Sequence, residues 1–293
     1  MLSLLAEATQ YLRFEDLGLS KGIPLGFELF GTPMVLRFYS LAYFAGIVLG
    51  YWHLTRMVKA PGAPLGQRHA EDLFFYCTIG IILGGRLGYA TFYTGGDSTL
   101  PSLWLDPVGM LKLWEGGMSF HGGVIGVLVA IVWVSWRNQL NFVRVCDYIA
   151  VNVPFGMLFG RLANFVNGEL WGRQTDVPWA IVFPGGGEVP RHPSQLYEAG
   201  LEGLLVMIVL LLLFWKTRAR FRPGLLVGVF TTLIAWSRFA VEFFREPDAQ
   251  LSDFAVQTGL SMGQWLTIPL SLVGVAMVIY ALIKPPLASG KAA

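Results

Sequence analysis

Charge and cysteine are both scarce in this sequence. Charged residues make up 14% of its 293 positions, and the formal net charge of +2 is too small to suggest a nucleic-acid partner. The two cysteines, Cys77 and Cys146, provide neither a disulfide framework nor a zinc-ligand spacing. We expect both to behave as small buried hydrophobic side chains.

Long polar connections are also missing. No segment between the apolar stretches is long enough for a soluble domain of ordinary size, and residues 1–34 lack the basic and apolar regions of a signal peptide. We expect residues 1–34 to form an arm outside the membrane or at its surface. The rest is strongly apolar: 54% of the residues are hydrophobic, and 10 Trp and 10 Tyr suit the two membrane interfaces.

Seven apolar stretches are long enough to cross a hydrocarbon layer about 30 Å thick. They are residues 35–54, 72–93, 118–136, 145–166, 196–215, 224–244 and 262–283. The sequence therefore predicts an all-α polytopic membrane protein with about seven transmembrane helices in one domain, residues 35–283. Outer loops are expected at 94–117 and 167–195, and a tail at 284–293.

The distribution of Lys and Arg predicts which side each loop faces. Eleven lie in the loops after the first, third and fifth stretches and in the tail, seven lie on the opposite side over more residues, and three lie inside stretches. Because basic residues favour the cytoplasmic side, we expect the N-terminus outside (periplasmic or extracellular) and the C-terminus in the cytoplasm.

Polar groups at membrane depth are the strongest functional signal. A charge in hydrocarbon costs roughly 2.5–3.5 kcal/mol on insertion scales, so an ionisable residue there is a functional candidate by default. Arg86, Arg161 and Arg238 each lie about 14–16 residues from the inner end of a stretch, which predicts an outer-leaflet depth. The same depth is predicted for His121, Tyr39, Glu198 and Glu202. We expect an outward-facing site in the outer third of the bilayer.

Helical spacing groups several of these side chains. Arg161 and Asn164 share one helix face, and Arg238, Glu242 and Arg245 share another. Two plainer interpretations stay open. Arg238 and Glu242 could only neutralise each other so that their helix inserts, and Arg161 and Asn164 could only clamp neighbouring helices by hydrogen bonds.

Four glycine pairs have the small-xxx-small spacing that lets membrane helices approach closely. They are Gly46/Gly50, Gly80/Gly84, Gly122/Gly126 and Gly156/Gly160. Gly122 and Gly123 also leave the backbone open beside His121, where a lipid head group could lie. His121 is the best single candidate for a general base, because histidine can change charge near neutral pH. A purely structural histidine is the alternative.

Four separated motifs carry a family resemblance. They are residues 119–123 (SFHGG), 160–169 (GRLANFVNGE), 191–198 (RHPSQLYE) and 238–248 (RFAVEFFREPD). In this order they closely resemble bacterial prolipoprotein diacylglyceryl transferases, and the likeness extends from about Tyr39 to Ile283.

The resemblance implies a transferase that moves the diacylglyceryl group of phosphatidylglycerol to the lipobox cysteine thiol of a preprolipoprotein. A thioether forms and glycerol phosphate leaves, as the first step of lipoprotein maturation. The family works in the bacterial inner membrane without metal or organic cofactor. The expected partners are therefore phosphatidylglycerol, the lipobox peptide and membrane lipid. We expect a monomer whose active site faces the periplasmic leaflet.

The motifs also imply site residues. His121, Arg161 and Arg238 are the predicted catalytic residues, with Glu242 the second choice for the base. The predicted substrate-binding residues are Tyr39, Arg86, Asn164, Glu169, Gly172, His192, Glu242 and Arg245. Ile234 departs from the family, because a tyrosine is expected there, and the short segment 171–190 predicts a reduced head subdomain.

The residue chemistry supports the same reaction without the resemblance. Arginine offers a planar fork of donors to phosphate oxygens, and a cysteine thiol becomes a strong nucleophile when a base removes its proton. One alternative is a transporter or channel for an anionic substrate, although transporter sites lie nearer the midplane. Another is an intramembrane hydrolase, which lacks a recognisable serine or cysteine nucleophile in this sequence.

Overall fold

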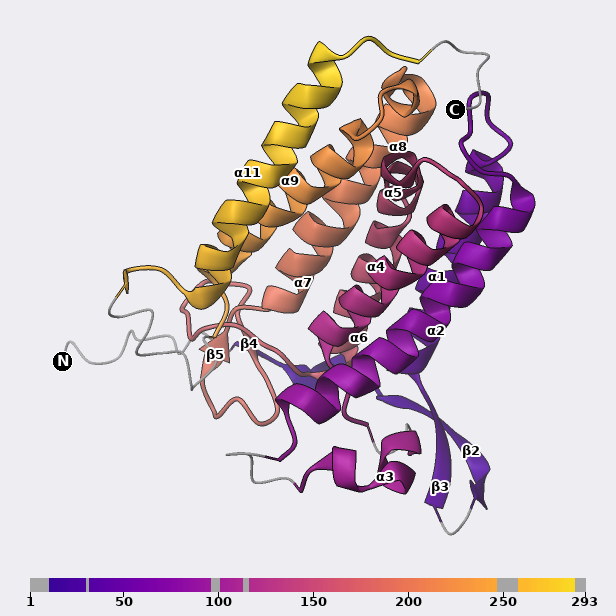
Figure 1. Ribbon diagram of the computed structural model, residues 1–293. Helices are drawn as coiled ribbons and strands as arrows, with labels where there is room; N and C mark the ends of the chain where they lie inside the picture. The colour runs from indigo at the N-terminus through magenta and orange to yellow at the C-terminus, as the bar shows by residue number, and fades with distance from the viewer. Residues whose placement is uncertain (1–10, 30–31, 96–100, 113–115, 247–257, 288–293) are drawn as a thin grey trace, which may run out of the picture. The chain divides into compact units, whose positions relative to one another are not determined.

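The computed structural model describes residues 11–29, 32–95, 101–112, 116–246 and 258–287 (Figure 1). Helices dominate these residues, and the chain divides into two compact units. The large unit contains residues 1–52 and 149–286, and the small unit contains residues 53–148 and 287–293. The chain passes from one unit to the other within α1 (Phe38–Met57) and near the end of α5 (Phe142–Ala150).

In the small unit, α2 (Gln67–Phe92) packs against α4 (Phe120–Arg137) through glycines. A Cβ atom on Gly84 would overlap the carbonyl oxygen of Gly122, and one on Gly80 would lie only 2.5 Å from that of Gly126. The glycine spacing thus predicted a close helix pair correctly. The short elements η2 (Leu103–Leu105) and α3 (Pro107–Leu111) lie between the two helices in sequence.

In the large unit, α6 (Val153–Asn167) begins with Pro154 in its first turn, a position that does not need the missing N–H. The following membrane helix, Ser194–Lys216, is made of α7 (Ser194–Glu198), the π-helix η4 (Ala199–Leu205) and α8 (Val206–Lys216). After the short turn η5 (Ala219–Phe221) come α9 (Leu225–Val241) and α11 (Met262–Ile283), which lie side by side (Figure 1).

Strands are an addition that the helical patterns did not predict. β1 (Leu12–Arg13), β4 (Ile181–Val182) and β5 (Pro190–Arg191) form a three-stranded sheet in the order β1-β4-β5. Phe14, Ile181 and Phe183 form a small buried apolar cluster beside it. β2 (Gly22–Leu29) and β3 (Thr32–Arg37) form an antiparallel hairpin.

Among the described residues, five helices are long and apolar enough to cross a membrane. They are Gln67–Phe92, Phe120–Arg137, Phe142–Asn167, Ser194–Lys216 and Met262–Ile283. The chain is therefore a helical, polytopic membrane protein. The other two predicted spans correspond to α9, which is apolar but shorter, and to α1, which has 20 residues but is not among the five long apolar helices. Seven spans and the orientation of the termini stay predictions.

The α2–α4 contact makes a testable prediction. Gly84→Ala should lower the thermal stability of the protein in detergent, because its methyl group overlaps the Gly122 backbone and overpacking typically costs about 1–3 kcal/mol. Gly123→Ala is the matched control, since its nearest new neighbour would be the Ile81 carbonyl oxygen at 3.8 Å. Equal melting temperatures for the two variants would contradict close glycine packing.

Candidate active site

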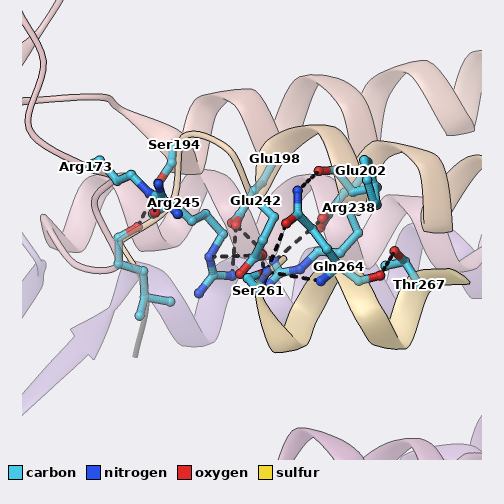
Figure 2. Close-up of polar contacts among 12 residues, drawn as sticks. Arg173, Ser194, Glu198, Glu202, Arg238, Glu242, Arg245, Ser261, Gln264 and Thr267 are labelled. Atoms are coloured by element: carbon cyan, nitrogen blue, oxygen red, sulfur yellow. Dashed lines mark hydrogen bonds and ion pairs between the residues drawn. The ribbon is translucent and has the colours of Figure 1, made fainter. Parts of the chain in front are cut away.

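Arg161 on α6 and Arg238 on α9 meet at one carboxylate. Glu198, the last residue of α7, places its Oε2 2.8 Å from Nη1 of Arg161 and its Oε1 3.2 Å from Nη1 of Arg238. Arg245 donates to the same Oε1 at 3.1 Å. Three segments far apart in the sequence are therefore joined at Glu198, as Figure 2 shows for Arg238 and Arg245.

Two more carboxylates complete the cluster. Glu202 Oε2 lies 3.4 Å from Nη2 of Arg161, and its Oε1 lies 3.8 Å from Nη1 of Arg238. Glu242 Oε2 lies 3.2 Å from Nη2 of Arg238 and 3.9 Å from Nε of Arg245. We call these six residues, three arginines and three glutamates, the charge cluster. Its formal charges cancel.

Burial differs between the two signs of charge. The side chains of Glu198 and Glu202 are 1% and 2% exposed, whereas those of Arg161 and Arg238 are 24% and 26% exposed. The carboxylates of Glu198 and Glu202 are thus buried beneath the arginines, whose guanidinium groups remain partly exposed. Pairing removes the large cost of isolated buried charges, while the open surface leaves the arginines accessible to an anion.

A π-helix positions the two buried glutamates, Glu198 and Glu202. Glu198 directly precedes η4, and Glu202 lies within it. π-helical turns are rare and often occur at functional sites. Gly203 in the same segment lets it approach α6 closely, because a Cβ atom there would lie 2.7 Å from the Cα of Leu158. This contact holds both glutamates near the helix that carries Arg161.

The sequence patterns predicted the same depth for Glu198 and Glu202 as for the arginines but gave them no role. Their four-residue spacing puts both on one helix face, and three intramembrane-depth arginines need counter-charges. Those two signals together could have identified them. The cluster contains the Arg238–Glu242 pair expected from spacing, but this pair is one part of a larger network.

Asn164 and Glu169 form a second polar pair beyond Arg161. The amide of buried Asn164 donates to Glu169 Oε1 at 2.9 Å, and Asn167 donates to the same oxygen at 3.1 Å. The helix ends between them: Gly168 adopts φ +67°, in the left-handed region that favours glycine. Because of this turn, Glu169 folds back toward the face that carries Asn164.

Gly172 and His192 lie where the segment between α6 and α7, residues 168–193, packs against the residues just after α9. A Cβ atom on Gly172 would overlap the carbonyl oxygen of Phe244, so only glycine fits. The Gly172 N–H donates to the His192 carbonyl at 2.9 Å. Gly172 also forms a β-bridge with Arg245. This packing fixes the backbone of a residue in the charge cluster.

The side chain of His192 belongs to an aromatic group. Its Nδ1 lies 3.1 Å from the Tyr197 hydroxyl, and its ring packs edge-on against Phe244 with centroids 5.1 Å apart. Burial lowers the pKa of His192 below its ordinary value. These contacts indicate that His192 stabilises the packing of the segment between α6 and α7.

Tyr39 lies at the start of α1, and its hydroxyl donates to that of Tyr43 at 3.2 Å. The Tyr43 ring in turn lies close to the Gly160 position on α6. A Cβ atom on Gly46 would lie 2.8 Å from the Cα of Gly156. The glycine pairs thus bring Tyr39 close to the helix that carries Arg161, in agreement with the sequence prediction of close packing.

Arg86 and His121 belong to the small unit. Arg86 is buried, and its guanidinium donates to backbone carbonyls of Gly109, Met110, Lys112, Gly116 and Gly117. These bonds anchor residues 109–112 and 116–117 to α2. A substrate-binding role for it stays a prediction. His121 is exposed in the first turn of α4, which Ser119 caps through the Gly122 N–H. Its catalytic role also stays a prediction.

The described residues include no group of three or more His, Cys, Asp or Glu side chains that could hold a metal ion. Cys77 and Cys146 are free thiols of intermediate burial. Neither belongs to the charge cluster, so a nucleophilic role for them has no support in the geometry.

Comparison with known proteins decides the family. The model of the prolipoprotein diacylglyceryl transferase family matches residues 24–280, which include the whole charge cluster. The chain belongs to this family. It is a transferase enzyme, and the resemblance that the four motifs predicted is confirmed.

Several relatives within the family cover nearly the whole chain. The phosphatidylglycerol–prolipoprotein diacylglyceryl transferase of Erythrobacter litoralis is 64% identical over 278 residues, 94% of each chain. That of Zymomonas mobilis is 47% identical over 92% of this chain and 93% of its own. That of Rhizobium leguminosarum bv. trifolii is 46% identical over 86% and 89%. A transporter or channel, the main alternative, is therefore disfavoured.

The lowered pKa of His192 predicts a pH effect on stability. Its folded pKa lies below its unfolded value of about 6.5, so the neutral ring favours the folded state above that pH. This contribution is lost as the pH falls through 6.5 toward the folded pKa. His192→Gln should remove it, so the difference in melting temperature between wild type and variant should shrink from pH 7.5 to pH 5.5. A constant difference would contradict a neutral, partly buried His192.

Proposed function

We propose that this chain transfers the diacylglyceryl group of phosphatidylglycerol to the lipobox cysteine thiol of preprolipoproteins and releases glycerol phosphate. Family membership and the names of the relatives support the reaction. The observation that supports its location is the meeting of Arg161, Arg238 and Arg245 on Glu198 within apolar helices.

In this proposal, Arg161 and Arg238 hold the lipid phosphate. Their guanidinium groups are partly exposed while their carboxylate partners are buried, so donors remain on the accessible side. Guanidinium groups bind phosphate oxygens through parallel hydrogen bonds. Fixed charges in a water-poor site also stabilise developing charge without reorganisation, and this stabilisation usually accounts for most of an enzyme's rate enhancement.

The transfer itself needs one proton acceptor. The thiol sulfur attacks the glycerol carbon that carries the phosphate ester, a carbon–sulfur bond forms, and the carbon–oxygen bond breaks. Both electrons of that bond stay on the oxygen of glycerol phosphate, and the thiol proton passes to a base. His121 is our first choice for this base. Glu242 is the second choice. It ranks below His121 because one of its oxygens pairs with Arg238 at 3.2 Å, and taking up a proton would weaken this ion pair.

The remaining site residues take binding roles. Asn164 and Glu169, already joined by a hydrogen bond of 2.9 Å, would grip the hydroxyls of the lipid head group. Tyr39 would close the site from α1. Gly172, His192 and Arg245 would shape its outer wall, where the segment around residue 172 packs on the end of α9.

We also propose the finer topology. Seven helices would cross the bacterial inner membrane, with α1 and α9 as the two beyond the five long apolar helices. The N-terminus would face outward and the C-terminus the cytoplasm, so that a monomer presents its site to the periplasmic leaflet. The lipid tails would enter sideways between helices, since a two-tailed substrate has no reason to leave the bilayer.

The direct test mixes the purified protein with phosphatidylglycerol and a lipobox peptide. We expect a peptide carrying diacylglycerol in thioether linkage, together with glycerol phosphate. Free diacylglycerol without modified peptide would indicate a hydrolase, and the absence of both products would contradict the proposal.

In the same assay Arg161→Lys should reduce kcat/KM by about tenfold or more, because lysine keeps the positive charge but lacks the two parallel N–H donors of the guanidinium group. Near-normal activity would contradict fork-like phosphate binding.

The role of His121 can be tested through the peptide thiol. His121→Gln should slow transfer strongly at pH 7, where few thiols with a pKa near 8.5 are ionised. Raising the pH to about 9 should shrink the defect, because the thiol then loses its proton without help. A defect that is equally large at both pH values would remove His121 as the base and leave it a structural residue.

A further inference from the structure

The two buried glutamates of the charge cluster hold the arginines with different strength. Glu198 contacts Arg161, Arg238 and Arg245 at 2.8–3.2 Å. Among the residues that the structure describes, Glu202 forms ion pairs with Arg161 and Arg238 alone, at 3.4 and 3.8 Å. Each glutamate has one buried oxygen without a hydrogen bond among the described residues, but that of Glu198 lies 2.8 Å from an Arg161 nitrogen, whereas that of Glu202 lies 3.8 Å from an Arg238 nitrogen. Glu198 is thus tightly engaged, whereas Glu202 is a loosely held anion beside the same two arginines.

Glu202 also has the geometry of a competitor for phosphate. One of its oxygens faces each of the two arginines, so its carboxylate bridges them. A phosphate held by both guanidinium groups would bridge them in the same way. Because Glu202 is fixed on η4, its effective concentration at the arginines is high. The Glu202 carboxylate can accept hydrogen bonds from Arg161 and Arg238 as soon as a phosphate begins to leave them.

The chemistry of the reaction makes such a competitor useful. The substrate is a phosphate diester with one negative charge, whereas the product is a monoester that carries more. In a water-poor site, arginines would hold the more highly charged product more tightly than the substrate. An enzyme gains nothing from binding that persists after the transition state. A tethered carboxylate offsets this excess attraction.

We propose that Glu202 competes with phosphate for Arg161 and Arg238 and thereby speeds release of glycerol phosphate. Glu198 differs: it is a positioning residue that holds the three arginines in place. This inference rests on the proposed function, since it concerns the product of that reaction.

The test compares the same substitution at two positions on one helix. Glu202→Gln and Glu198→Gln are assayed as full-length protein in vesicles of phosphatidylglycerol, with a lipobox peptide and added glycerol phosphate. Glu202→Gln should lower the inhibition constant of glycerol phosphate by about tenfold, the worth of one charge-assisted hydrogen bond, and lower kcat without raising KM. Glu198→Gln should instead raise both KM and the inhibition constant.

Glu188→Gln is the matched control, because this exposed glutamate pairs with Arg13 outside the cluster. It should leave all three constants unchanged. An inhibition constant for Glu202→Gln that is unchanged, or raised as in Glu198→Gln, would overturn the proposal. If Glu202→Gln does not fold, Glu202→Asp withdraws the carboxylate by one methylene and should also lower the constant. If wild type forms no thioether product, the proposed function itself fails, which is a separate outcome.

Discussion

The pairing of Arg161, Arg238 and Arg245 with buried carboxylates is the interaction on which the rest of this structure depends. None of these charges is stable alone among apolar helices. Held around Glu198 at distances of 2.8–3.2 Å and balanced by Glu202 and Glu242, they form a neutral group that still has exposed guanidinium surface. The same arrangement that lowers the cost of these charges among apolar helices is the one at which we propose that an anionic lipid head group binds.

Close packing at glycines holds the segments that carry this charge cluster together. Gly203 lets the π-helical segment approach α6, and Gly172 lets the segment between α6 and α7 pack against the residues just after α9. Glu242 is enclosed by the start of α11, where a Cβ atom on Gly263 would lie 2.9 Å from its carboxyl carbon. Ser261 and Gln264 cap that helix beside it (Figure 2). Glycines thus lie where two backbone segments near the cluster approach closely and, at Gly263, where the backbone meets a charged side chain.

Much of this could be predicted from the sequence, because the signals are local. Apolar length predicted a polytopic helical protein, glycine spacing predicted close packing of helices without saying which ones pair, and motif order predicted the family. The rest depends on long-range packing. The role of Glu198 as the common partner of three arginines is invisible until α6, α7 and α9 are brought together. The short strands and the anchoring of Arg86 by backbone carbonyls likewise have no periodic signal in the sequence.

An experimental structure of the protein with bound phosphatidylglycerol would test the central claim most directly. The account predicts phosphate oxygens about 3 Å from guanidinium nitrogens of both Arg161 and Arg238, with Glu198 still in contact with the two arginines. A phosphate bound elsewhere, with neither guanidinium within hydrogen-bonding distance, would contradict it.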